Sequence, residues 1–219
     1  MRPSSLIQAF RPAPLALAAS ALAASAVLSA GCAAHTGAHK LIPIPYPGYE
    51  VEEGAAVIRA HGYEVTILPL DDVAREAFIA ARAGGGIDPF GPGPDGKARY
   101  LTFRLLVENT TAKDLVTFQP QNILLTTDVG DRITPLDYPQ AYSRLVGVAS
   151  SDPRLVSDLS KYLFDVGVSV AAGKSALGLL VYPAPKATGR KLRMEFSFFQ
   201  VNGESSANSD VFFAGEPGR

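Results

Sequence analysis

The chain has 219 residues, with 20 Lys and Arg against 21 Asp and Glu, and a formal net charge of −1. This balance gives no electrostatic reason to expect nucleic-acid binding. A composition of 47% hydrophobic and 19% charged residues excludes wholesale disorder. The single cysteine excludes an intrachain disulfide and a metal site built from several cysteines.

The first 31 residues have the composition of an export signal. Arg2 and Arg11 are the only charged residues before Lys40, and residues 15–28 are almost wholly Ala, Leu, Val and Ser. This pattern predicts a signal peptide over residues 1–31. A plain secretory signal or a membrane-spanning anchor are the alternatives, because an apolar run of this length is just long enough to cross a bilayer.

The apolar stretch ends in Leu28-Ser29-Ala30-Gly31-Cys32. This sequence resembles the lipobox of bacterial lipoprotein precursors. The resemblance implies cleavage after Gly31, a diacylglyceryl group on the Cys32 sulfur, and a palmitate-type acyl chain on the new amino terminus. Two or three acyl chains anchor a protein stably, where one does not. Ala33, in place of Asp, resembles the Gram-negative sorting pattern for the outer membrane, so we expect a lipid-anchored envelope protein.

Residues 32–49 are predicted to form a lipidated tether. The Pro-rich part, residues 42–48, is typical of extended chain that would hold a domain away from the membrane. His35 and His39 have the spacing of a helical metal pair, but no helix signal or carboxylate accompanies them in this segment. We therefore expect neither a metal nor a cofactor there.

The first part of the domain combines strands with one helix. Apolar runs predict strands at 55–59 and 63–68 around a tight turn at His61-Gly62. Asp71 and Asp72 predict the cap of a helix that ends at Gly84. The expected apolar face of this helix is Val73, Ala77, Ala80 and Ala81. The Gly- and Pro-rich residues 84–97 predict a mobile loop.

The rest of the chain alternates short strands and turns. The predicted strands are 100–108, 115–118, 123–127, 132–136, 166–170, 176–182, 192–201 and 211–213. Residues 137–165 interrupt them, and Asp152-Pro153 there predicts the start of a helix with Leu155, Val156, Leu159 and Leu163 on its apolar stripe. We therefore predict one domain, 50–219, of the all-β class: an antiparallel β-sandwich with helical insertions near 71–84 and 137–165.

A second resemblance covers roughly residues 100–201. It rests on Phe103-x-Leu105-x-Val107-x-Asn109-Thr110, on Ile123-x-Leu125-x-x-Asp128-x-Gly130, and on Gly173-Lys174-Ser175-Ala176-x-Gly178-x-Leu180-Val181-Tyr182. This order is similar to the immunoglobulin-like domains of bacterial surface lipoproteins, of the DUF4352-like kind. The resemblance implies a non-catalytic sandwich, and it implies no ligand.

Several short motifs fall short of a catalytic or metal-binding pattern. Gly173-Lys174-Ser175 matches the end of a phosphate loop, but Val168 stands where that motif needs Gly and a strand follows it. Gly167-Val168-Ser169-Val170-Ala171 resembles a nucleophile elbow without its last Gly or its helix. Asp128 and Asp131 are interpreted as a turn rather than a Ca²⁺ site, and Asn109-Thr110-Thr111 as a strand end rather than a glycan acceptor. We predict no enzyme activity.

Aromatic residues mark the places where a partner would bind. Phe196 and Phe198 are predicted to share the core face of their strand. Phe199 is predicted to lie on the other face and to be covered by an inserted helix, with a role as an exposed contact residue as the alternative. Tyr138, Tyr142 and Arg144, in the segment that interrupts the strands, form the predicted partner surface, because exposed Tyr and Arg are enriched in binding hot spots. The alternative is that tyrosines of this segment, such as Tyr142 and Tyr162, seal the edge of the core.

The sequence thus predicts a non-enzymatic, lipid-anchored lipoprotein of the cell envelope. Its partners would be the membrane, through Cys32, and an envelope protein that binds the sandwich or is assembled with it. The alternative is a periplasmic or surface binder of a small apolar or glycan ligand, held between the sandwich and the inserted helices. A solid core at that place would disfavour this alternative.

Overall fold

The computed structural model describes residues 40–215 apart from 86–87, 147–156, 165 and 186–190. The chain divides into two units, 1–34 and 35–219, and every described residue belongs to the second. The predicted signal peptide, Gly31 and Cys32 therefore lie outside the described residues, as do Asp152-Pro153 and the start of the helix predicted from them.

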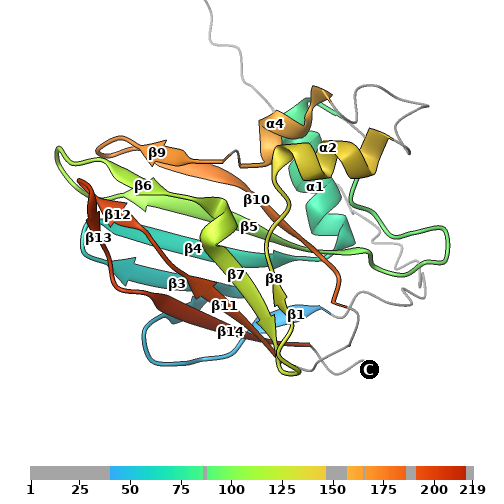
Figure 1. Ribbon diagram of the computed structural model, residues 1–219, viewed down its shortest axis with the longest axis horizontal. Helices are drawn as coiled ribbons and strands as arrows, with labels where there is room; N and C mark the ends of the chain where they lie inside the picture. Colours follow the sequence, from blue (N-terminus) through green and yellow to red (C-terminus); the bar gives the residue numbers. More distant parts are fainter. Residues whose placement is uncertain (1–39, 86–87, 147–156, 165, 186–190, 216–219) are drawn as a thin grey trace, which may run out of the picture. The chain divides into compact units, whose positions relative to one another are not determined.

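One face of the sandwich is a five-stranded antiparallel sheet in the order β10–β5–β4–β3–β2 (Figure 1). Its strands are β2 (Glu50–Glu52), β3 (Ala55–Ala60), β4 (Tyr63–Leu70), β5 (Tyr100–Asn109) and β10 (Ser175–Pro183). The turn predicted at His61-Gly62 joins β3 to β4, with Gly62 at a φ of 90°. A side chain on Gly62 would also come within 2.9 Å of Thr111, so this position needs glycine twice over.

The opposite face consists of a five-stranded sheet, ordered β1–β14–β11–β7–β8, and a four-stranded sheet, ordered β13–β12–β6–β9. Their strands are β1 (Leu41–Pro43), β6 (Val116–Phe118), β7 (Ile123–Thr127), β8 (Arg132–Ile133), β9 (Val168–Val170), β11 (Lys191–Phe196), β12 (Gln200–Val201), β13 (Glu204–Ser205) and β14 (Ser209–Gly215). All the pairings within these sheets are antiparallel. The predicted fold class, an antiparallel β-sandwich with small helical insertions, is confirmed.

Two chain segments each connect a strand of one sheet on this face to a strand of the other. The 3₁₀ turn η1 (Pro120–Asn122) lies between β6 and β7, and residues 197–199 lie between β11 and β12. The predicted strand 192–201 is therefore broken. Phe198 adopts a φ of 62° and is 62% exposed, so its predicted place in the core is wrong. Phe199 is buried as predicted, but Phe118 covers it, with ring centroids 4.9 Å apart, rather than an inserted helix.

The main core lies between the two faces. Its largest fully buried members include Phe103, Leu105, Tyr182 and Phe213. The Tyr182 hydroxyl donates to the carbonyl of Ile123 on the opposite face at 2.8 Å, which satisfies its only polar group. Burial of these side chains on strands with period-two alternation is what selects the register of each sheet.

A second core covers the outer side of β10. The helices α1 (Asp72–Ala83), α2 (Tyr138–Val146) and α4 (Leu159–Tyr162) lie together at one end of the sandwich (Figure 1). Alternate residues of β10 face opposite ways: Leu180 packs in the main core, while Leu179 and Val181 pack under the helices. The second core consists of Ile79, Phe90, Leu136, Ala141, Leu145, Leu159, Tyr162, Leu163, Leu179 and Val181. Strand β10 is therefore buried on both faces.

Helix α1 begins and ends where the sequence predicts, but a different face is buried. The Asp71 side chain accepts the amide of Ala74 at 2.8 Å, and Gly84 ends the helix with a φ of 76°. Val73 is 65% exposed, whereas Ile79 is buried and Phe78 is partly buried against the second core. Phe and Ile bury far more apolar area than the alanines of the predicted face, so they decide the rotation of the helix.

The predicted spacer and the predicted mobile loop both differ from the structure. Residues 41–43 form β1 and pair with β14, so the folded domain begins before residue 49. The Tyr49 hydroxyl donates to the carbonyl of Ile44 and accepts the amide of Phe212 at 3.1 Å, which fastens this segment. In the Gly/Pro loop, Phe90 is 1% exposed and meets Tyr100 edge to face at 5.4 Å. A single large aromatic side chain thus anchors a segment whose composition predicts mobility.

Candidate functional site

Helix α2 carries all three residues of the predicted partner surface. Its inner face packs Ala141 and Leu145 into the second core, and Asp137 accepts the amide of Gln140 at 2.7 Å before the first turn. The neighbouring side of the helix presents Tyr142, which is 45% exposed, and Val146, which is 46% exposed. Arg144 is also exposed. The structure thus brings the predicted residues onto one short helix.

Tyr138, Tyr142 and Val146 form a continuous stripe, because residues four apart lie on the same side of a helix. We call these three residues the α2 stripe. The rings of Tyr138 and Tyr142 stack with centroids 6.2 Å apart and planes at 30°. Tyr138 is partly buried against the second core, so it braces the more exposed Tyr142. Tyr142 therefore lies open to solvent and does not seal the core edge, whereas Tyr162 is 2% exposed and does.

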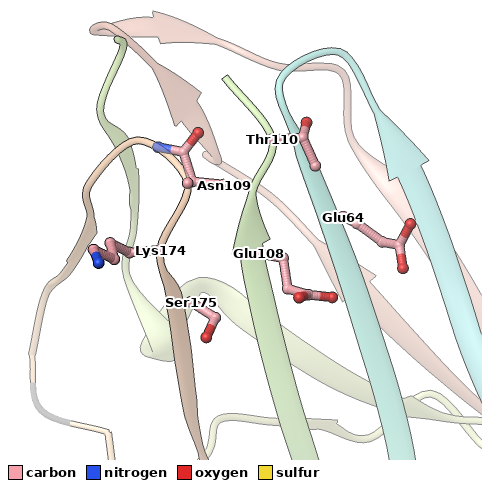
Figure 2. A pocket seen from close by; sticks show the side chains of 7 residues that line it. Glu64, Glu108, Asn109, Thr110, Lys174 and Ser175 are labelled. Carbon is pink, nitrogen blue, oxygen red and sulfur yellow. The ribbon is translucent and has the colours of Figure 1, made fainter. Parts of the chain in front are cut away.

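A shallow hollow of about 320 Å³ lies near the opposite end of the sandwich, lined by Glu64, Glu108, Asn109, Thr110, Gly173, Lys174 and Ser175 (Figure 2). Glu64, Glu108 and Ser175 are direct neighbours across three strands. The Glu64 carboxylate already pairs with the Arg59 guanidinium at 2.9 Å. Glu108 is exposed near the end of β5, and Lys174 and Ser175 are exposed at the start of the paired strand β10. This hollow is polar and open, and its lining residues are largely engaged with one another or with solvent.

The side chain of Asn109 joins three segments of the chain, a role that its sequence context does not reveal. Its side chain is 3% exposed and makes four hydrogen bonds. The amide group donates to the carbonyls of Asp114 at 2.9 Å and Val170 at 2.7 Å. The amide oxygen accepts the backbone N–H of Thr111 at 2.9 Å and its hydroxyl at 2.7 Å. The interpretation of Asn109 as a strand end is therefore confirmed, and its amide nitrogen is not accessible.

A buried charge network beneath the helices is also invisible in the sequence. Arg75 is 2% exposed and lies on the packed side of α1. Its guanidinium pairs with Asp72 at 2.7 Å and with Asp88, from the Gly/Pro loop, at 2.7 Å. Burial raises the pKa of the nearby Tyr162 hydroxyl well above its ordinary value, and the negative charges of Asp88 and Asp158 raise it further. The buried ion pair between Arg75 and Asp88 therefore holds the Gly/Pro loop against α1.

The two incomplete motifs lie on strands and turns. Gly173 has a φ of 64°, and Lys174 follows it as an exposed residue before β10, so no helix N-terminus faces this turn. Ser169 lies in β9 and is exposed, and the chain continues from there into the hairpin to β10. Neither segment has the backbone of the motif it resembles. The interpretation of Asp128-Val129-Gly130-Asp131 as a turn is confirmed, with the Gly130 amide bonded to the carbonyl of Thr127 at 3.0 Å.

Two searches of the described residues gave negative results. Residues 40–215, with the gaps given above, contain no group of three or more His, Cys, Asp or Glu placed to hold a metal ion. Among the helices in the same part of the chain, none has the length and apolarity needed to cross a membrane.

Comparisons with known proteins add little to this description. No family model matches the chain, and no curated protein matches it. Among solved structures, the crystal structure of the yjhA protein from Bacillus subtilis is similar over 64% of this chain and 76% of that chain. The sequence identity is 11% and the TM-score is 0.37. We draw no functional conclusion from a similarity of this degree.

Proposed function

We propose that this chain is a non-enzymatic lipoprotein of the cell envelope, anchored through acylated Cys32, whose β-sandwich binds an envelope protein or supports an envelope assembly. The anchor is inferred from the lipobox-like Leu28-Ser29-Ala30-Gly31-Cys32 at the end of an apolar leader. In a host with two membranes, Ala33 after the cysteine favours the outer one.

The observation that carries the binding role is the α2 stripe. Helix α2 is fastened by its inner face, so the exposed Tyr142 and Val146 do not contribute to the second core. Tyr supplies a large contact area with only two rotatable side-chain bonds, Arg supplies several hydrogen-bond donors, and both residues are enriched in measured binding hot spots. Tyr142 and Arg144 are both exposed on α2, but residues two apart do not face each other on a helix. The α2 stripe is therefore the surface suited to protein recognition, and Arg144 lies outside it.

The alternative function, binding of a small ligand between the sandwich and the helices, finds no support in the packing. The place assigned to that ligand is occupied by Ile79, Phe90, Leu159, Leu179 and Val181. These side chains are between 0 and 1% exposed, so helix and sheet close directly on each other. We therefore retain the protein-binding role alone.

In-cell crosslinking of the epitope-tagged protein, followed by mass spectrometry, tests the proposal. We expect a discrete envelope protein that is recovered with the native chain, reduced with Cys32→Ala, and lost with Tyr142→Ser plus Arg144→Ser. This double variant leaves Tyr138 in place, because Tyr138 also packs on the second core. Phe198→Ser, which removes an exposed aromatic ring elsewhere, is the matched control.

Two results would contradict the proposal. Unchanged recovery with the Tyr142 and Arg144 double variant would show that α2 does not bind the partner. A mass at the mature N-terminus without acyl groups would show that Cys32 is not an anchor.

A further inference from the structure

The folded domain begins much nearer to Cys32 than the sequence predicts. Leu41 already pairs with Gly215 in the sheet, so only the eight residues from Ala33 to Lys40 separate the proposed anchor from the first strand. Whatever their conformation, eight residues span at most about 28 Å. As a flexible coil they would span roughly 16 Å. The anchor therefore keeps the start of β1 close to the bilayer surface.

The start of β1 and helix α2 lie at the same end of the sandwich (Figure 1). Phe213, which pairs with Pro43 of β1, contacts Phe103 with ring centroids 5.1 Å apart. Phe103 is paired in turn with Leu180 of β10, whose neighbours Leu179 and Val181 lie under the helices. Two strand-to-strand spacings, one sheet-to-sheet spacing and one helix-to-sheet spacing lie along this path, about 30 Å in total, which is an upper bound on the separation of β1 from α2. A short tether at β1 holds α2 near the membrane as well.

The charge on α2 favours a protein over the lipid surface itself. Helices that bind membrane surfaces carry several Lys or Arg on the polar face. In residues 137–146, Arg144 is balanced by Asp137, which caps the helix. The stripe also combines two tyrosine rings with one valine, which is little apolar area for insertion between lipids. Its chemistry fits a shallow apolar patch on a protein.

The size of the stripe indicates how such a partner would be held. Three side chains on a nine-residue helix make up a small fraction of the roughly 800 Å² that each side of a stable interface buries. A contact this small is weak between freely diffusing proteins. Confinement of both proteins to one membrane raises their effective concentration, so that a weak contact can form a populated complex.

From these observations, and resting on the proposed function, we infer that the protein bound by α2 is embedded in the same membrane that holds the Cys32 anchor. The partner presents to α2 a surface close to that membrane. The short tether then contributes to recognition, because it limits the distance between α2 and the membrane surface.

A photo-crosslinking experiment with two tether lengths tests the inference. The photoreactive residue p-benzoylphenylalanine replaces Tyr142 in the full-length chain in cells, and in a control chain it replaces the equally aromatic, exposed Phe198. Each chain is made with the native tether and with twenty Gly and Ser residues inserted before Lys40. We expect an adduct between position 142 and an integral membrane protein. Its yield should fall about sixfold with the long tether, because effective concentration falls as the −3/2 power of linker length.

The remaining outcomes would overturn the inference. Equal yield at both tether lengths, an adduct with a protein that fractionates as soluble, or adducts with phospholipid alone would each exclude a membrane-embedded partner at α2. If no protein adduct forms at position 142 with either tether while Cys32 is acylated, the proposed binding function fails as well. A failure of the inference is thereby distinguished from a failure of the function.

Discussion

Replacement of Asn109 gives the sharpest test of the structural reasoning. Its side chain joins the end of β5 to two other segments, through the carbonyls of Asp114 and Val170. Asn109→Ala removes four hydrogen bonds and leaves the Val170 carbonyl buried without this donor. A buried group left unsatisfied costs about 1–3 kcal/mol, and each partly exposed partner costs about 0.5–1.5 kcal/mol. We expect a loss of about 3–4 kcal/mol in the free energy of unfolding.

Asn109→Asp separates the hydrogen bonds from the shape of the side chain. The carboxylate retains the acceptor for Thr111 but turns a second oxygen toward two carbonyls. It should therefore cost at least as much as Asn109→Ala at neutral pH, although it is nearly isosteric. The exposed Asn208→Asp is the control, with an expected change below about 0.5 kcal/mol.

Urea unfolding of the leaderless Cys32→Ala protein, followed by circular dichroism, measures these differences. For a chain of this size, 3 kcal/mol corresponds to a Tm lower by roughly 6–12 °C. A loss below 1 kcal/mol for Asn109→Ala, or wild-type stability for Asn109→Asp, would refute the reasoning.

Three further predictions concern buried charge, backbone strain and pH. Arg75→Met leaves Asp72 and Asp88 without their buried partner, so we expect the free energy of unfolding to fall by about 3–5 kcal/mol. Adding Asp72→Asn and Asp88→Asn should restore much of this loss. If urea unfolding shows no such recovery, the charge network is contradicted. Phe198→Asn should leave the free energy of unfolding unchanged or raise it by up to about 1 kcal/mol, because Asn tolerates a positive φ. A loss above about 2 kcal/mol in thermal unfolding would show that the Phe198 side chain contributes to the core. Burial raises the pKa of Tyr182 and of Tyr162, so the folded state keeps their protons while the unfolded state releases them above about pH 10. Stability should be fully retained below that pH and fall by about 1.4 kcal/mol per pH unit for each such tyrosine above it. Unfolding free energies measured from pH 8 to 11.5 would test this, and Tyr162→Phe should flatten the slope.

Local patterns sufficed to predict most strands and one helix of this fold. The alternation in residues 100–108 predicts β5 to within one residue, and residues 123–127 coincide with β7. Asp71 and Gly84 mark the ends of α1 correctly, because capping depends on a few adjacent residues. The α2 residues were identified as a surface by residue type alone, without their helix.

The features that the sequence left undetermined all depend on distant partners. Strand β1 is three residues long and is stabilised by β14, which lies at the other end of the described chain. Burial of Arg75 depends on its ion pair with Asp88, which lies in the Gly/Pro loop and is distant from Arg75 in the sequence. Phe198 lies outside the core, against the prediction, because the chain changes sheets between β11 and β12, and strand periodicity does not register such a crossing.

The pairing of β1 with β14 also decides how the domain responds to mechanical load. A pull along the chain from the N-terminal side reaches the described fold first at Leu41, where three residue pairs between β1 and β14 bear the load. If β1 peels away, the next point of resistance is Tyr49, whose hydroxyl links the carbonyl of Ile44 to the amide of Phe212. Tension would therefore release a few residues in a short first step, with the sandwich intact behind this tyrosine, before any larger extension.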